Sequence, residues 1–177
     1  MKYFYVGGAS VIFLKKLSLN DDEKIYDMLQ EIASNDNGFH NKVNGMSYKE
    51  FRKWLKKEYA VDNGKLDKWM VPQTSYWLYD GDKPIGYGRI RHYLNDNLEK
   101  TGGHIGYAIR STERGKGYGN TILTLLLEEC KTLNIETVQI GANVDNTPSN
   151  KIILKHNGVL FRCSDEKNFY HIKLNSR

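Results

Sequence analysis

Cysteines, long apolar runs and a signal sequence are scarce or missing in this chain of 177 residues. Its two cysteines, Cys130 and Cys163, fit a reducing cytoplasm better than a disulfide framework, and a chain of this length buries a substantial core without disulfides. No apolar run approaches the length of a membrane span, and Lys15 and Lys16 follow too soon for the apolar core of a signal peptide. The sequence therefore predicts one cytoplasmic domain over residues 1–177, without membrane contact.

Metal-binding patterns and a concentrated basic patch are also missing. The five histidines form no close pair, so no metal site is expected. The formal net charge of +5 is modest and spread along the chain. Lysines 53, 56 and 57 resemble the solvated face of a helix, and no helix carries clustered base-reading side chains, so no nucleic-acid partner is expected.

Residues 114–119, Arg-Gly-Lys-Gly-Tyr-Gly, place three glycines at alternate positions. A strand-like run, residues 104–110, precedes them, and apolar residues at helical spacing follow from residue 122. Glycine permits positive φ and a close approach to the main chain, and a helix start offers unpaired N–H groups. With Arg114 and Lys116 beside it, this loop predicts a site for a multiply charged anion such as a pyrophosphate.

Glycines at this spacing also occur in ordinary flexible turns. The sequence of residues 114–119 does not match the patterns of two better-known phosphate-binding loops. A dinucleotide fingerprint requires Gly-x-Gly-x-x-Gly, and a phosphate-binding P-loop ends in Gly-Lys-Ser/Thr. The pattern that does match is Arg/Gln-x-x-Gly-x-Gly/Ala, met by Arg114, Gly117 and Gly119. It resembles the acetyl-coenzyme A loop of the GNAT superfamily of N-acetyltransferases.

The resemblance extends over roughly residues 70–174, and it is strongest to a bacterial branch of predicted acetyltransferases. Residues 76–91, 102–107, 145–150 and 157–158 look like successive landmarks of that fold. It implies an α/β (α+β) fold with a central, mixed and mostly antiparallel twisted sheet. We expect about six to seven strands, about four flanking helices and a splay between the fourth and fifth strands.

Local patterns predict the elements along the chain. Asn20 with Glu23, and Ser47 with Glu50, resemble capping boxes for two helices, the first reaching about residue 34, where residues 35–38 end it. Thr147 and Pro148 suit the N-cap and the first position of a short helix closed at residues 157–158. Residues 1–10 are either a frayed start or an extra strand, residues 95–101 a polar connection, and strands are expected at residues 11–17, 75–79, 85–93, 104–110, 136–144, 159–163 and 169–174.

The resemblance also implies which residues hold acetyl-coenzyme A as co-substrate. The main chain of the fourth strand would hold the pantetheine arm and polarise the thioester carbonyl, while N–H groups of residues 114–120 bind the pyrophosphate. Positions in the short helix would contact the cofactor arm. The implied cofactor-binding residues are Ala108, Ile109, Arg110, Arg114, Gly115, Lys116, Gly117, Tyr118, Gly119, Asn120, Asn143, Asn146, Ser149 and Asn150.

The implied reaction is direct attack of a primary amine on the thioester in a ternary complex, the acceptor being a small molecule or an exposed amino group. Related transferases often carry Glu where this chain has His104, which could serve as general base or be a structural residue. The family's proton-donating tyrosine position falls on Ile153. Tyr107 and Tyr170 are substitutes, each with a core-aromatic alternative.

The acceptor side is less determined. Residues 39–46 are either a substrate-facing loop or an ordinary surface loop, and Arg89 and Arg91, two apart on one strand face, either bind an acidic acceptor or pair with acidic neighbours. Relatives often dimerise through late strands, which makes residues 169–174 a candidate homodimer contact. The alternative function is a non-catalytic acyl-coenzyme A-binding or regulatory module on the same scaffold.

Overall fold

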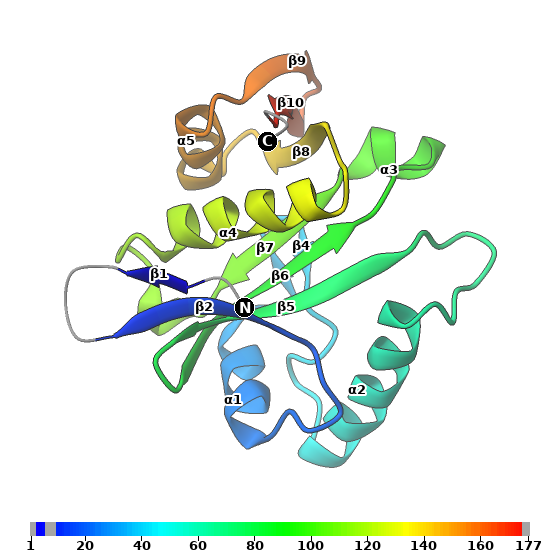
Figure 1. Cartoon of the computed structure of the whole chain (residues 1–177), viewed down its shortest axis with the longest axis vertical. Helices are drawn as coiled ribbons and strands as arrows, with labels where there is room; N and C mark the ends of the chain where they lie inside the picture. The colour runs from blue at the N-terminus through cyan, green and yellow to red at the C-terminus, as the bar shows by residue number, and fades with distance from the viewer. Residues whose placement is uncertain (1–2, 6–9, 175–177) are drawn as a thin grey trace.

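The computed structural model describes residues 3–5 and 10–174, and two antiparallel sheets organise them (Figure 1). The larger sheet has the order β1-β2-β5-β6-β7, and the smaller has the order β8-β10-β9. A separate two-stranded hairpin is formed by β3 and β4. The strands are β1 (Tyr3–Tyr5), β2 (Val11–Lys16), β3 (Asn35–Asp36), β4 (Phe39–His40), β5 (Gln73–Asp80), β6 (Lys83–Arg91), β7 (Ile105–Ile109), β8 (Thr137–Asn143), β9 (Val159–Cys163) and β10 (Lys167–Lys173).

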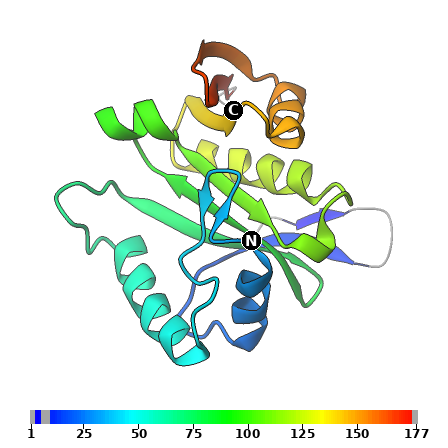
Figure 2. The ribbon, with the colours of Figure 1, turned by 180° about the vertical axis from the view of Figure 1, so that it is seen from behind.

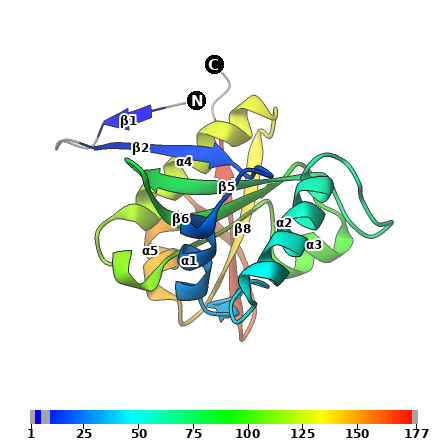
Figure 3. The ribbon, with the colours of Figure 1, turned by 90° about the horizontal axis from the view of Figure 1, so that it is seen from below.

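Helices cover both faces of the larger sheet. In Figure 1, α4 lies above this sheet and α1 and α2 lie below it, while Figure 3 looks onto α1 and α2 in front of the sheet. The α5 helix packs beside the smaller sheet. The helices are α1 (Glu23–Glu31), α2 (Tyr48–Asp62), α3 (Asp96–Thr101), α4 (Tyr118–Thr132) and α5 (Thr147–Lys155), with a short 3₁₀ turn η1 (Ser111–Glu113).

The core divides into two apolar clusters because the central strand β5 is covered on both faces. Tyr76 and Leu78 join the cluster under α4, whereas Trp77 and Tyr79 join the cluster under α1 and α2. Successive side chains of a strand point to opposite faces of the sheet, so the apolar residues of β5 contribute alternately to the two clusters. The sheet is thereby held rigidly between two helical layers.

The expected splay is present between β7 and β8. Within the described residues, the pairing on this side is limited to one isolated bridge, between Gly103, just before β7, and Ile140 of β8. A Cβ on Gly103 would lie 2.4 Å from the carbonyl oxygen of Gln139, and its φ is +109°. Glycine is therefore required where the two sheets meet, and beyond this point the edge of β7 that faces β8 has no strand partner in the described chain.

Several local predictions hold and others are wrong. Ser47 and Glu50 form the predicted capping box, and Asn157 has the left-handed conformation expected there. The N-cap of α1 is Asp22 rather than Asn20, since its side chain accepts from the N–H of Lys24, and the helix already ends at Glu31.

Three further segments differ from the expectation, and Tyr3–Tyr5 follow one of the two alternatives given for residues 1–10. Residues 95–101 form α3, capped by Asn95, instead of a plain connection. The N-cap of α5 is Asn146, not Thr147. Residues 35–40 form the β3–β4 hairpin instead of only ending the first helix. Of residues 1–10, Tyr3–Tyr5 pair with β2 as an extra strand, and residues 1–2 and 6–9 lie outside the described part.

Candidate functional site

The glycine loop between η1 and α4 presents unpaired N–H groups. Gly115 and Gly117 have φ values of +78° and +88°, and Gly117 is the N-cap of α4. The N–H of Arg114 donates to the carbonyl of Ser111 at 3.4 Å, and that of Asn120 to the carbonyl of Gly117 at 3.0 Å. Within the described chain, the N–H groups of residues 115–119 have no acceptor. An anion bound here would supply those acceptors.

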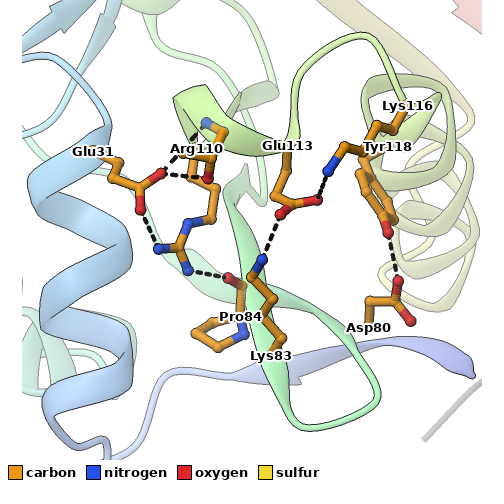
Figure 4. A network of polar contacts seen from close by, with 9 residues as sticks. Glu31, Asp80, Lys83, Pro84, Arg110, Glu113, Lys116 and Tyr118 are labelled. Carbon is orange, nitrogen blue, oxygen red and sulfur yellow. Dashed lines mark hydrogen bonds and ion pairs between the residues drawn. The ribbon is translucent and has the colours of Figure 1, made fainter.

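A polar network fixes this loop from below (Figure 4). The carboxylate of Glu113 is buried and accepts hydrogen bonds from the ammonium groups of Lys83 and Lys116, the latter at 2.9 Å. These bonds, that of Lys83 first, hold the pKa of Glu113 below its usual value. Next to it, Tyr118 donates to Asp80. Hydrogen bonds therefore hold Glu113, the residue just before the loop, in a fixed position. The ammonium of Lys116 is already hydrogen-bonded to this carboxylate.

Arg110 belongs to the neighbouring part of the network. Its guanidinium donates to Glu31 on α1 and to the carbonyl of Pro84 at 3.1 Å, and Thr112 donates to the same carboxylate at 2.7 Å. The hydrogen bond from Arg110 lowers the pKa of Glu31 to about 2. The side chain of Arg110, the residue after β7, thus ties this end of the strand to α1.

A cavity of about 430 Å³, here called the loop cavity, opens over the glycine loop. It extends along β7 and between the starts of α4 and α5. Most of the predicted cofactor-binding residues line it: Ala108, Ile109, Arg114, Gly115, Gly117, Tyr118, Gly119, Asn120, Asn146 and Ser149. Arg110, Lys116, Asn143 and Asn150 do not line it.

A second cavity of about 240 Å³, the cleft cavity, lies in the splay between β7 and β8. Both cavities share Tyr107, Asn146 and Ser149 as lining residues. The hydroxyls of Tyr107 and Ser149 lie 3.3 Å apart at this junction, and Asn146 accepts from the N–H of Ser149 at 3.2 Å. Burial raises the pKa of Tyr107, so its hydroxyl keeps its proton at neutral pH.

Tyr170 and Asn150 have a supporting position instead. Tyr170 is buried and donates to the side-chain oxygen of Asn150 at 2.6 Å. The amide of Asn150 then donates to the carbonyls of Asn143 and Asn146, both at 2.8 Å. Because Tyr170 lines neither cavity, the proton-donor role predicted for it does not fit; it holds the turn between β8 and α5.

The general-base role predicted for His104 does not fit this geometry either. The backbone N–H of Gln139 donates to Nδ1 of His104 at 3.0 Å. A neutral imidazole with an occupied Nδ1 carries its hydrogen on Nε2, so it has no lone pair left to accept a proton. Burial also lowers the pKa of His104, and the residue lines neither cavity. Its hydrogen bond instead joins β8 to the start of β7, which fits the structural alternative.

The two arginines predicted on the acceptor side both line the cleft cavity, but their partners differ. Arg89 donates to Glu58 on α2 at 2.9 Å and to the hydroxyl of Tyr87. Arg91 donates to the carbonyl of Gly103 at 2.9 Å. The acidic-neighbour alternative therefore holds for Arg89, whereas Arg91 has no carboxylate partner among the described residues.

The β3–β4 hairpin supplies Asp36, which sequence reasoning missed, and His40, which lies in the segment 39–46 considered as a substrate-facing loop. Figure 2 shows this hairpin standing in front of the larger sheet. Asp36 lines both cavities and pairs with Arg114, while His40 lines the cleft cavity. A Cβ on Gly38 would lie 3.0 Å from the side-chain oxygen of Asn143, so the turn packs closely on β8. The Asn37-Gly38 pair was the available signal, because Asn-Gly favours two-residue hairpins.

Two general features complete the description. No group of three or more His, Cys, Asp and Glu side chains in the described chain could hold a metal ion. Among the described residues, no helix is both long and apolar enough to cross a membrane.

Comparisons with known proteins identify the family and agree with the fold. Residues 41–158 match the model of the acetyltransferase (GNAT) family. Among solved structures, the RimL ribosomal L7/L12 alpha-N-protein acetyltransferase in complex with coenzyme A superposes with a TM-score of 0.74 at 14% identity, covering 99% of this chain and 100% of that one. The microcin C7 self-immunity acetyltransferase MccE, in complex with acetyl-CoA and AMP, gives 0.69 at 16% identity with 92% of each chain covered.

A chimera of spermidine N-acetyltransferase SpeG from Vibrio cholerae and hSSAT gives a TM-score of 0.63 at 16% identity, covering 92% of this chain and 95% of that one. These identities are low, so the superpositions establish the fold alone. No curated protein sequence matches the chain. The family model, however, spans more than half of the chain, including the glycine loop and both helices that border the loop cavity, and the chain belongs to the GNAT family of acetyltransferases.

Proposed function

We propose that the protein transfers the acetyl group of acetyl-coenzyme A to a primary amine by direct attack in a ternary complex. The observation that carries this proposal is the meeting of two cavities at the Tyr107–Ser149 hydroxyl pair. One cavity ends on the free N–H groups of the glycine loop, and the other opens between the splayed strands. A donor thioester and an acceptor amine entering from opposite sides would meet at this pair.

The loop cavity fits coenzyme A in the chemistry of its lining. The free N–H groups of residues 115–119 would bind the pyrophosphate, and the unpaired edge of β7 would hold the pantetheine arm. Arg114 lines this cavity as well and, although it pairs with Asp36, would add an N–H donor to the bound group. The relatives crystallised with coenzyme A or acetyl-CoA, RimL and MccE, support the same assignment.

Proton transfer is assigned to residues at the junction. We propose that Tyr107 or Ser149 donates a proton to the thiolate when the carbon–sulfur bond breaks, because the pair faces both cavities. For the proton lost by the amine, we propose His40 in place of His104. Of the five histidines, His40 is the one that lines the cleft cavity, and its side chain is exposed to solvent that can carry the proton away.

The acceptor is proposed to be a primary amine of a small molecule. RimL acts on a protein α-amino group and SpeG on spermidine, so both named relatives acetylate amines. The cleft cavity, at about 240 Å³, lies below the roughly 300–1,000 Å³ of pockets for drug-sized ligands. A small acceptor therefore fits it better than a bulky one.

Two measurements test the proposal. Calorimetric titration should show coenzyme A binding with a stoichiometry near one. Thiol release from acetyl-coenzyme A should then depend on an added amine, and initial rates should give intersecting patterns as both substrates are varied. Amine-independent hydrolysis alone would contradict acetyl transfer.

A non-catalytic acyl-coenzyme A-binding module is the second candidate. It is favoured by the hydrogen bond that occupies Nδ1 of His104, because the cleft cavity then has no buried general base among its described lining residues. This candidate predicts coenzyme A binding of ordinary strength with no thiol release for any amine. The same two assays therefore separate the alternatives.

A homodimer and a cytoplasmic location remain proposals. The contact predicted at residues 169–174 is unsuitable for edge pairing, because β10 already pairs with β8 and β9 on its two sides. The open edge of the smaller sheet is β9, whose Val159, Leu160 and Phe161 are exposed, so we place a dimer contact there. Free thiols at Cys130 and Cys163 fit a reducing compartment.

A further inference from the structure

The cleft cavity carries more positive than negative charge that is free to meet a ligand. Apart from Tyr107, its ionisable lining residues are Asp36, His40, Arg89, Arg91 and Lys167. Arg89 is neutralised by Glu58, and Asp36 by Arg114. In the part of the chain that the structure describes, no carboxylate pairs with Arg91 or Lys167.

Arg91 and Lys167 reach the cavity from different strands and meet at one segment. The guanidinium of Arg91 donates to the carbonyl of Gly103 at 2.9 Å, and the ammonium of Lys167 donates to the carbonyl of Thr101 at 2.6 Å. These carbonyls lie two residues apart where α3 ends. Each bond uses one donor of its cation, which leaves further donors of both groups for a ligand.

The charge of Arg91 is also poorly solvated. Burial, followed by the nearby charge of Arg89, lowers the pKa of Arg91 to about 10. Carbonyl dipoles compensate a buried cation only in part, and an anion placed against it would restore the lost solvation. A polycation would add a further like charge to the same cavity.

We propose that the acceptor is a small primary amine that also carries a carboxylate or phosphate, bound through Arg91 and Lys167. This proposal rests on the acetyl transfer proposed above and names its substrate class. The acceptor's anionic group would lie at the α3 end of the cleft cavity, and its amine would point toward the Tyr107–Ser149 junction. Polyamines and amines without an anionic group should be poor acceptors.

Matched pairs of amines test this with the full-length chain. The two matched pairs are glycine with glycinamide and O-phosphoethanolamine with ethanolamine. Spermidine and a short peptide with an acidic N-terminal residue complete the panel. In each pair the anionic member should have the higher kcat/KM in thiol release. Loss of a charge-assisted contact corresponds to roughly 10- to 150-fold, so Arg91→Gln and Lys167→Gln should each raise KM for the anionic amine by about that factor. KM for acetyl-coenzyme A should stay unchanged.

Lys173→Gln is the matched control, because Lys173 is exposed on the same strand as Lys167 and lines neither cavity. Calorimetric binding of the same amines to the coenzyme A-loaded protein supplies a readout that does not require turnover. Charge-dependent binding without thiol release would uphold the acceptor class and reject the transferase function. If the neutral and the anionic amine of each pair give the same kcat/KM, or if no anionic amine binds, the proposed acceptor class is wrong. If Arg91→Gln does not fold, Lys167→Gln carries the test.

Discussion

Replacing Gly117 with valine should remove coenzyme A binding while the chain stays folded. Gly117 has a φ of +88°, and a Cβ built there meets nothing within 4 Å. The new side chain would therefore enter space that is empty in the protein alone and that lines the loop cavity. Its cost to folding comes from the left-handed backbone, which for a non-glycine residue is about 1–3 kcal/mol.

The binding loss should be larger than the folding loss. The isopropyl group would lie among the free N–H groups of residues 115–119, where we place the pyrophosphate. Two lost hydrogen bonds to a charged group, at about 1.5–3 kcal/mol each, amount to more than a 100-fold loss of affinity. Calorimetric titration with coenzyme A measures this directly.

Gly64→Val is the matched control for backbone strain. Gly64 has a φ of +93°, also has nothing within 4 Å of a built Cβ, and follows α2 away from both cavities. Both variants should lower Tm by similar amounts, about 2–4 °C for each kcal/mol in a chain of this size. Only Gly117→Val should lose affinity. A folded Gly117→Val protein that binds coenzyme A like the wild type would refute the assignment of the loop.

Four further substitutions probe the charges and the hydroxyl pair. Arg114→Gln should weaken coenzyme A binding by about 1–3 kcal/mol, because Arg114 lines the loop cavity and its guanidinium keeps a further N–H donor beside its bonds to Asp36 and Ile109. Lys116→Gln should change it by less than about 0.5 kcal/mol, because Lys116 does not line this cavity and pairs with Glu113, and equal effects in calorimetry would contradict this. Tyr107→Phe should lower kcat about 10- to 100-fold with KM for acetyl-coenzyme A unchanged, and wild-type turnover would remove Tyr107 as proton donor. Glu31→Gln should lower the free energy of unfolding by about 1–3 kcal/mol at pH 7. The folded pKa of Glu31 is depressed from 4.5 to about 2, so this stability is present above pH 4.5 and is lost toward pH 2; denaturant unfolding of both proteins should converge over that window, and a constant difference would contradict it.

The glycine loop and the capping box of α2 could be predicted because their chemistry is local. Gly117 is needed for its own backbone conformation, and Ser47 and Glu50 satisfy N–H groups within one turn. The β3–β4 hairpin is local as well, yet its strands are only two residues each, too short to show an alternating pattern. Its Asn37-Gly38 turn was the sole signal, and the same residue types also end helices.

Which cations remain free could not be predicted, because their partners are remote in sequence. Asp36 lies 78 residues from Arg114, and Thr101 lies 66 residues from Lys167. His104 illustrates the same limit, since the N–H that occupies its Nδ1 belongs to Gln139, 35 residues away. Its position at the start of the fourth strand matched the family, but a long-range backbone contact decides whether its lone pair is available.

Because the cations at the two cavities have different partners, we expect the protein to bind anions there in two different ways. Around the glycine loop, four cations, Lys83, Arg110, Arg114 and Lys116, face three carboxylates, those of Glu31, Asp36 and Glu113. Attraction for the pyrophosphate must therefore come chiefly from the N–H groups of residues 115–119, which are fixed dipoles at short range. In the cleft cavity, Arg91 and Lys167 donate to carbonyl oxygens and have no carboxylate partner among the described residues. Screening by salt acts on full charges more than on short-range dipoles, so added salt should raise KM for the acceptor more steeply than KM for acetyl-coenzyme A.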